Sequence, residues 1–291
     1  MPKKIPTLPE GFQVKEGIAW GSRHEGLLEI SIWNMKKKNS ITSGSQNQIG
    51  KIVTGAQKDE NVKVILVHGG LSFCSGNDLS KLADSTPRTE EEKNDLMSEG
   101  VEYHMVRNLR VLNRNVKPIV CLVRGHSIGI GFTMTSLFDF IYCSPDATFS
   151  TPFMKSCQSP EGTSTYSFVQ QFGLRKANEI LLLDKPITAQ EAVQNGYANG
   201  IIEGLDDEHW PDITKIPAIP KLLATDYRTL VNCKELLNAA KDNARIEETA
   251  SREAVALVDS WKDPDFPPKL MKFMASVMSA GKKKKQPQPK L

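Results

Sequence analysis

The sequence lacks the features that mark several large classes of protein. Its five cysteines are scattered along 291 residues with no C-x-x-C pair, so they indicate neither a zinc site nor a disulfide framework, and a reducing compartment is the simplest expectation. No stretch approaches the roughly 20 apolar residues of a membrane span. The first twelve residues contain lysines and prolines without an apolar run, which resembles neither a signal peptide nor an Arg-rich transit peptide.

A strong charge of one sign is also missing. The formal net charge is +3, and much of the excess lies in two clusters, Lys36 to Lys38 and Lys282 to Lys285, which argues against a nucleic-acid-binding polycation. A hydrophobic content of 39% with 24% charged residues suits a globular protein with a substantial core. We find no internal repeats. Composition predicts an N-terminal extension (1–11), a core (12–210), a C-terminal helical subdomain (211–280) and a Lys/Pro-rich tail (281–291).

Strand-like and helix-like segments are both present in the core, which predicts an α/β fold. Residues 12 to 33 contain two alternating runs that indicate a hairpin, and two compact β-branched runs, 62 to 67 and 117 to 123, are typical of strands buried on both faces. Short strands are expected at 140–142, 147–150 and 197–202. The expected helices are 42/43 to about 58, 90–113, 174–183 and 188–195 in the core, then 222–240, 246–261 and 270–278 in the all-helical C-terminal part.

Two glycine-rich loops follow the two buried strands. The first reads F-C-S-G-N-D-L from Phe73 to Leu79, and the second runs from Arg124 to Gly131 and opens an apolar helix through Phe138. Loops at the carboxyl ends of parallel strands commonly form sites, and a glycine-rich turn at a helix start presents free N–H groups to an anion. A dinucleotide fingerprint is rejected, because Met134 stands where its third glycine belongs and no acidic residue follows at the expected distance.

A single carboxylate stands out in the stretch C-Q-S-P-E-G-T-S, residues 157 to 164. Glu161 is flanked by Pro160 and Gly162, which indicate a turn, and Thr163 or Ser164 can cap a helix through residue 172. No Lys or Arg lies between Lys155 and Arg175, so burial would raise the pKa of this carboxyl toward the range of a general base. The alternative is an ordinary first-turn residue that faces water and is favoured by the helix dipole.

Three motifs together resemble the crotonase (enoyl-CoA hydratase/isomerase) superfamily: F-C-S-G-N-D-L at 73–79, G-H-S-I-G-I-G at 125–131 and T-P-F…S-P-E-G at 151–162. The similarity extends over about residues 12 to 280 and is greatest to the peroxisomal type of Δ3,Δ2-enoyl-CoA isomerase. It implies a crotonase-like spiral of ββα repeats over 12–210, a C-terminal helical trimerisation region, a homotrimer or a hexamer built as a dimer of trimers, and an acyl-coenzyme A thioester as substrate. Neither a metal nor a redox cofactor is required by the chemistry implied.

The resemblance assigns roles to particular residues. The backbone N–H groups of Ser75 and Ile130 would form an oxyanion hole for the thioester carbonyl, and an enolate oxygen does need two convergent donors of this kind. Glu161 matches the single catalytic acid/base of the isomerases. Hydratases of the family carry two glutamates, at positions that match Thr133 and Phe153 here. The family pattern therefore implies a proton shuttle without a carboxylate pair to activate water.

The coenzyme A site implied by the resemblance begins at the basic loop Lys36-Lys37-Lys38-Asn39, whose lysines would pair with phosphates. The alternative is an ordinary solvated turn. Asp78 either contributes to this site or only caps the following turn through its own backbone. We expect structural roles for His68, Cys74 and His126. The complete expected coenzyme A set is Lys36, Lys37, Lys38, Asn39, Ser75, Asn77, Asp78 and Leu79.

The expected function is the conversion of 3-enoyl-CoA to trans-2-enoyl-CoA during oxidation of unsaturated fatty acids. Two alternatives remain: another crotonase reaction, such as thioester hydrolysis or hydration, and a non-catalytic acyl-CoA-binding scaffold like the chromodomain-Y-like corepressors, whose turn reads S-P-D-G. The ending Pro289-Lys290-Leu291 resembles a peroxisomal address, although proline replaces its usual small residue. A disordered tail, with a mitochondrial or cytosolic location, is the alternative.

Overall fold

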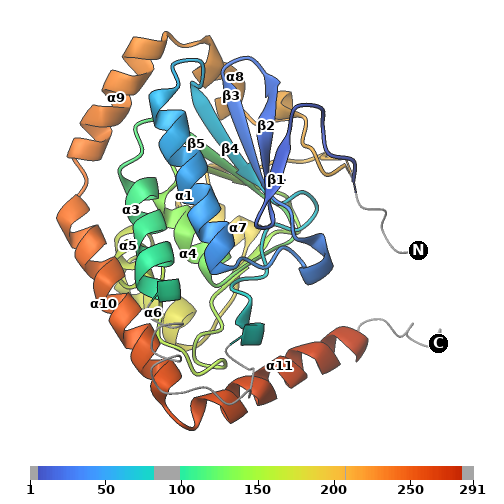
Figure 1. The fold of residues 1–291 in the computed structure, drawn as a ribbon, viewed down its shortest axis with the longest axis vertical. Coiled ribbons are helices and arrows are strands. Elements are labelled where there is room, and N and C mark those ends of the chain that lie inside the picture. Colours follow the sequence, from blue (N-terminus) through green and yellow to red (C-terminus); the bar gives the residue numbers. More distant parts are fainter. Residues whose placement is uncertain (1–5, 82–98, 207, 284–291) are drawn as a thin grey trace.

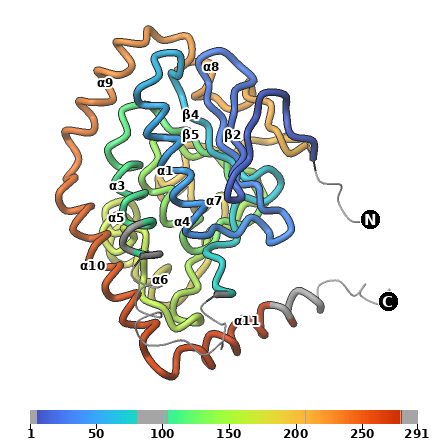
Figure 2. Tube along the Cα trace, viewed as in Figure 1, coloured from blue at the N-terminus to red at the C-terminus, as the bar shows by residue number. Residues whose placement is uncertain are grey.

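The computed structural model describes residues 6–81, 99–206 and 208–283 (Figure 1). The polar segment expected at 80–89 lies largely outside the described residues, and the Pro-Lys-Leu ending lies wholly outside them. Of the helix expected at 90–113, residues 90–98 are outside and the remainder is helical. None of the described helices is both long and apolar enough to cross a membrane. The described chain folds into a twisted sheet with helices packed against it, as an α/β fold requires (Figures 1 and 2).

The main sheet has seven strands in the order β1-β2-β3-β4-β5-β7-β10. The predicted hairpin is confirmed, and a short edge strand precedes it. From β3 onward every pairing is parallel, so the carboxyl ends of β4 and β5 share one edge of the sheet. The strands are β1 (Gln13–Lys15), β2 (Ile18–His24), β3 (Leu27–Ile32), β4 (Val64–His68), β5 (Ile119–Val123), β7 (Phe140–Cys143) and β10 (Gly200–Ile201). The last one is shorter than the predicted 197–202.

Burial of β4 and β5 on both faces explains their β-branched composition. In β4, Ile65 and Val67 face the larger hydrophobic cluster, which includes residues of the core helices. Val64 and Leu66 face a second cluster with Ile216 and residues near it in the C-terminal part. All five residues of each strand are buried. The period-two alternation of a strand divides these side chains between two cores, as predicted from the sequence.

A second sheet was only partly predicted. It consists of β6 (His126–Ile128), β8 (Thr148–Ser150) and β9 (Ile187–Thr188) in the order β6-β8-β9. Sequence analysis predicted β8 but treated residues 124–131 as a loop, because the glycines on both sides of β6 hide a three-residue strand. This strand pairs in parallel with β8, which fixes the second glycine-rich loop beside the main sheet.

The core helices follow the predicted pattern with local differences. Thr42 caps α1 through a capping box with Ser45. The helix predicted from the second glycine loop through Phe138 is instead a single α-helical turn, α4, followed by the 3₁₀ turn η4. The elements are η1 (Met35–Lys37), α1 (Ser43–Lys58), η2 (Leu79–Lys81), η3 (Glu99–Val106), α3 (Arg107–Asn113), α4 (Ile130–Thr133), η4 (Met134–Leu137), α5 (Ser164–Phe172), α6 (Leu174–Leu182) and α7 (Ala189–Gln194).

The C-terminal part is helical, as predicted. Figures 1 and 2 show α9 and α10 running along the outer side of the molecule and α11 turning away below it. The single helix predicted at 222–240 is divided at Thr225 and Asp226, and the Asp226 side chain caps the second piece. The elements are η5 (Ile213–Lys215), α8 (Ala218–Ala224), α9 (Tyr227–Ala239), α10 (Asn243–Lys262) and α11 (Phe266–Lys283).

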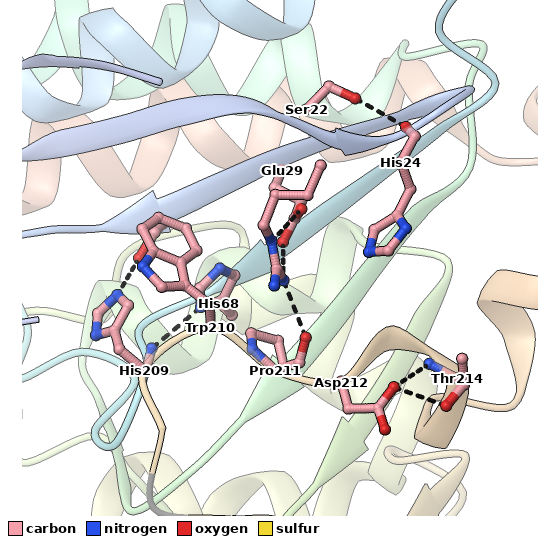
Figure 3. Close-up of polar contacts among 12 residues, drawn as sticks. Ser22, His24, Glu29, His68, His209, Trp210, Pro211, Asp212 and Thr214 are labelled. Atoms are coloured by element: carbon pink, nitrogen blue, oxygen red, sulfur yellow. Dashed lines mark hydrogen bonds and ion pairs between the residues drawn. The ribbon is translucent and has the colours of Figure 1, made fainter. Parts of the chain in front are cut away.

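A polar and aromatic cluster closes the face of the sheet opposite the core helices (Figure 3). Arg23 of β2 forms a two-pronged pair with the buried Glu29 of β3, at 2.9 and 2.7 Å, and also donates to the Pro211 carbonyl. His209 Nε2 lies 2.8 Å from the Ser31 hydroxyl, and its ring packs edge-on against His68 of β4. These contacts join the segment around residue 210 to three strands of the main sheet.

Candidate active site

The two glycine-rich loops are held together by backbone hydrogen bonds. The Cys74 N–H donates to the His126 carbonyl at 2.9 Å, and the Ile128 N–H donates to the Cys74 carbonyl at 3.0 Å. This pairing forms a parallel bridge between Cys74 and Ser127. Because Ser75 follows the first partner and Ile130 begins α4 just after β6, the bridge brings the two predicted oxyanion donors into one region.

Small residues are required where these loops touch. A Cβ at Gly131 would lie 2.6 Å from Cys74 Cβ, and one at Gly76 would lie 3.1 Å from the Ile128 carbonyl oxygen at a φ of +92°. Among the described residues, no group accepts a hydrogen bond from the backbone N–H of Ser75 or Ile130. Both donors are therefore available to a ligand oxygen, as an oxyanion hole requires.

Glu161 is buried beside α4, with 2% of its surface exposed. The alternative, a first-turn residue that faces water, is therefore wrong. Its Oε1 accepts a hydrogen bond from the Thr133 hydroxyl at 3.2 Å, while its Oε2 is buried without a partner in the described part of the chain. Burial, with a smaller contribution from the charge of Glu253, raises the pKa of this carboxyl to about 8, and the Thr133 hydrogen bond opposes the shift. A carboxylate with this pKa is a competent general base near neutral pH.

The turn that carries Glu161 adopts an uncommon backbone shape. Gly162 and Thr163 both have left-handed φ values, +74° and +68°. A Cβ at Gly162 would lie 2.1 Å from Thr133 Oγ1, so only glycine allows the turn to pack against α4. A β-branched residue such as Thr163 rarely adopts this region. Thr163 does occupy the position before α5, but its side chain makes no capping hydrogen bond, contrary to the prediction.

The predicted coenzyme A residues lie close together on the described chain. Lys36, Lys37 and Lys38 are exposed. Lys37 Nζ pairs with Asp78 at 2.6 Å, and the Ser75 hydroxyl donates to the Lys37 carbonyl at 3.2 Å. A parallel bridge between Ile41 and Asn77 joins the basic loop to the first glycine-rich loop, and Leu79 begins η2 just beyond it.

Two residues of this group have structural contacts of their own. Asn39 is buried, and its amide donates to the carbonyls of Gly69 and Ser72, both at 2.7 Å. Its side chain therefore shapes the loop and does not face outward. Asp78 accepts from the Ser80 N–H at 3.1 Å, so it caps the following turn as well as pairing with Lys37. Partial burial opposes the shift, but the hydrogen bonds from Lys37 and Ser80 lower the pKa of Asp78.

The other polar residues of the glycine loops are engaged locally. His126 Nδ1 lies 2.8 Å from the Thr148 hydroxyl, His68 Nδ1 accepts from the Gly70 N–H, and burial raises the pKa of the Cys74 thiol to about 12. Thr133 and Phe153, which match the two hydratase glutamates, are both buried. Neither side chain carries a carboxylate. No cluster of candidate metal ligands occurs within the described ranges.

Sequence analysis missed the contacts of α10 with the catalytic turn. The Glu253 carboxylate accepts hydrogen bonds from the backbone N–H groups of Thr163 and Thr165, at 2.6 and 2.8 Å. Trp261 Nε1 donates to Gln158 Oε1 at 3.1 Å. These partners lie about a hundred residues apart in sequence, and Glu253 reads as one acid among several in an amphipathic helix, so no local pattern pointed to them.

Comparison with known proteins gives consistent results. The chain is 29% identical to human (Homo sapiens) enoyl-CoA delta isomerase 2 in an alignment of 289 positions, which covers 93% of this chain and 68% of that one. It is also 29% identical to the rat (Rattus norvegicus) protein of that name. That alignment covers 86% of this chain but only 61% of the relative, which is less than two thirds. It is 27% identical to mouse (Mus musculus) peroxisomal enoyl-CoA delta isomerase 3, over 86% and 76% of the two chains.

Solved structures share the fold. The crystal structure of an enoyl-CoA hydratase/isomerase from Mycobacterium paratuberculosis superposes with a TM-score of 0.76 at 20% identity, covering 89% of this chain and 98% of that one. This likeness confirms the predicted crotonase-type α/β fold with its helical C-terminal region. The family model for enoyl-CoA hydratase/isomerase matches residues 22–258. Because this match extends over most of the sequence, the chain belongs to the enoyl-CoA hydratase/isomerase, or crotonase, family.

Proposed function

We propose that the protein is a Δ3,Δ2-enoyl-CoA isomerase that uses Glu161 as its only proton shuttle. Glu161 removes a proton from C2 of a 3-enoyl-CoA, and the electron pair of that C–H bond moves into the thioester carbonyl to give a dienolate. The N–H groups of Ser75 and Ile130 hold the dienolate oxygen. The protonated Glu161 then returns the same proton to C4, and the product is trans-2-enoyl-CoA.

The observation that carries the proposal is the isolation of the Glu161 carboxyl. Its Oε2 has no partner among the described residues, so it is free to meet a substrate hydrogen, and its pKa near 8 suits both removal and return of a proton. Glu253 lies nearby, but both of its oxygens accept hydrogen bonds from protein groups. Thr133 and Phe153 leave no second carboxylate at the hydratase positions to activate water.

Coenzyme A binding is part of the same proposal. The three exposed lysines of the basic loop would attract the phosphates of the substrate, and the Lys37–Asp78 pair would fix the loop beside the first glycine-rich loop. Replacing Lys36, Lys37 and Lys38 together by alanine should raise KM for the substrate with little effect on kcat, because the contacts are remote from the reacting carbons. An unchanged KM would contradict this assignment.

The decisive experiment compares wild type with Glu161→Gln on 3-hexenoyl-CoA. Loss of the general base should lower kcat by about 10²- to 10⁴-fold while coenzyme A binding, measured by calorimetry, is retained. Glu248→Gln is the matched control, because it removes an exposed carboxylate of α10. Wild-type turnover by Glu161→Gln would refute the mechanism. Hydration of crotonyl-CoA or release of free coenzyme A at a higher rate would indicate another crotonase reaction, and binding without turnover would indicate a scaffold.

We also propose a peroxisomal location and a trimeric or hexameric assembly. The mouse relative is named peroxisomal, and the Pro-Lys-Leu ending resembles the corresponding address. Several large apolar side chains are exposed on the C-terminal helices, among them Leu236, Leu237 and Val255, and burying them between subunits would remove them from water. Imaging a tagged protein with and without residues 289–291, and sedimentation analysis, test the two ideas.

A further inference from the structure

The carboxylate of Glu253 is unusually placed for an acid that takes no part in the proton transfer. It belongs to α10, is 5% exposed, and points at the start of α5. Its Oε2 accepts from the Thr163 N–H, and its Oε1 accepts from both the N–H and the hydroxyl of Thr165, at 2.6 to 2.8 Å. Burial raises the pKa of this carboxyl above its ordinary value, whereas the hydrogen bonds donated by Thr165 and Thr163 favour its ionised form and oppose that shift.

These contacts hold the turn that positions Glu161. Thr163 has a φ of +68°, a strained conformation for a β-branched residue, and its N–H donates to Glu253. On the other side of Glu161, Trp261 of α10 donates to Gln158. One helix therefore holds the catalytic stretch both before and after the reactive carboxylate.

The same contacts shape the electrostatics around Glu161. Free N–H groups at a helix start stabilise a nearby carboxylate, but here Glu253 occupies those of Thr163 and Thr165. Glu253 also brings a like charge near Glu161. Cys74 of the first glycine-rich loop and Thr133 of α4 also face Glu161, but both are uncharged, since burial keeps the Cys74 thiol protonated. Among the described residues, Glu253 is thus the charged group that acts on Glu161.

We propose that Glu253 is a positioning residue that makes Glu161 an effective base, both by holding its turn and by taking the helix N–H groups that would otherwise stabilise the Glu161 carboxylate. This inference rests on the proposed function of Glu161 as a proton shuttle. The two carboxyls divide their roles: one is ionised and bound to the backbone, and the other is poised to exchange a proton. Pairs of acids whose environments push their pKa values apart are common in acid–base catalysis.

The test is the pH dependence of kcat/KM in four proteins. In wild type, activity should rise with pH and level off above about 8, the pKa of Glu161. In Glu253→Gln the rise should move to lower pH, because the like charge is lost, whereas Glu253→Asp, which keeps the charge, should retain most of the wild-type profile. Glu248→Gln, an exposed acid on the same helix, should leave it unchanged. A Glu253→Gln profile that superposes on wild type at a reduced plateau would overturn the inference, because a merely structural role lowers activity without moving the titration.

A second measurement does not depend on activity or on the folding of a Glu253 variant. Infrared titration of the wild type should show a protonated carboxyl band near pH 6.5 that disappears in Glu161→Gln. Persistence of that band would place the proton on Glu253 and overturn the inference. A wild type that shows the band but does not isomerise 3-enoyl-CoA would contradict the proposed function alone, so the two failures are distinguishable.

Discussion

Glu161, the proposed base, illustrates how a buried carboxyl can reduce the stability of its own fold. Its pKa rises from 4.5 to about 8 on folding, so the folded protein binds a proton that the unfolded chain does not hold at neutral pH. The stabilisation that this group contributes is complete below about pH 4.5 and is lost as the pH rises through 8. Through this one group, the wild type therefore loses stability across that window.

Replacing Glu161 by glutamine should stabilise the protein above pH 5, because the amide is neutral in both states. The difference in free energy of unfolding between Glu161→Gln and the wild type should grow with pH and reach about 3 kcal/mol at pH 7. At pH 4 the two proteins should be equally stable. Urea unfolding at a series of pH values measures the difference. A difference that does not vary with pH would show that Glu161 keeps an ordinary pKa in the folded protein.

Prediction from sequence succeeded at single residues where a local pattern carried the information. The sequence shows directly that no Lys or Arg lies between Lys155 and Arg175, on either side of Glu161. It also indicates the turn at Pro160 and Gly162. The role of Glu253 was not, because its partners at the start of α5 become neighbours only after α10 packs. Asn39 was assigned to the ligand with its lysine neighbours, but its burial follows from a contact with residues 69 and 72 that no spacing rule reveals.

At the scale of elements, the packing of α4 against the first glycine-rich loop determines how the proposed oxyanion donors, Ser75 and Ile130, are placed. The buried strands β4 and β5 and the loops after them were predictable, since β-branched runs and glycines are local signals. The strand β6 was not, because its three residues form a strand only by pairing with β8 and with Cys74. That pairing, rather than either loop alone, aligns Ser75 with Ile130.

Gly131→Ala should disrupt this alignment. The added methyl group would lie 2.6 Å from Cys74 Cβ and 2.9 Å from its Sγ, so α4 or the loop must shift. We expect kcat/KM to fall by about 10²-fold or more, the typical effect of losing an oxyanion donor. Gly55→Ala is the control, because a Cβ there meets nothing within 4 Å and should stabilise α1 by about 1 kcal/mol. Wild-type kcat/KM in Gly131→Ala would show that the hole does not depend on this contact.

At the scale of the whole molecule, the cluster in Figure 3 joins remote parts of the chain through neutral histidines. Burial, with a smaller contribution from Arg124, lowers the pKa of His209 to about 4. Burial, followed by the charges of His209, Arg23 and Arg124, also lowers that of His68. For a base with a depressed pKa, the stability contribution is present above the ordinary value of 6.5 and is lost as the pH falls toward 4.

The histidines should therefore lower the stability on mild acidification, opposing the gain that Glu161 provides, and the change in Tm from pH 7.5 to pH 5 should be more favourable in His209→Gln than in the wild type. The glutamine can still bond to Ser31 but does not titrate. Thermal unfolding at pH 7.5 and pH 5 measures the change in Tm for each protein. His24→Gln provides the control, because His24 is an exposed histidine of β2 in the same region. The same change in Tm in His209→Gln as in the wild type would show that His209 does not contribute to the pH dependence.

The contacts of α10 with the catalytic turn also order the events of biosynthesis. The ribosome completes the main sheet at Ile201 and both glycine-rich loops well before it adds Glu253 and Trp261. Domains generally fold as units, and β4 and β5 also pack on Ile216 of the C-terminal part. A chain released before Glu253 would lack the helix that holds the turn of Glu161. The turn that carries the proposed base therefore depends on a segment that is synthesised about ninety residues after it.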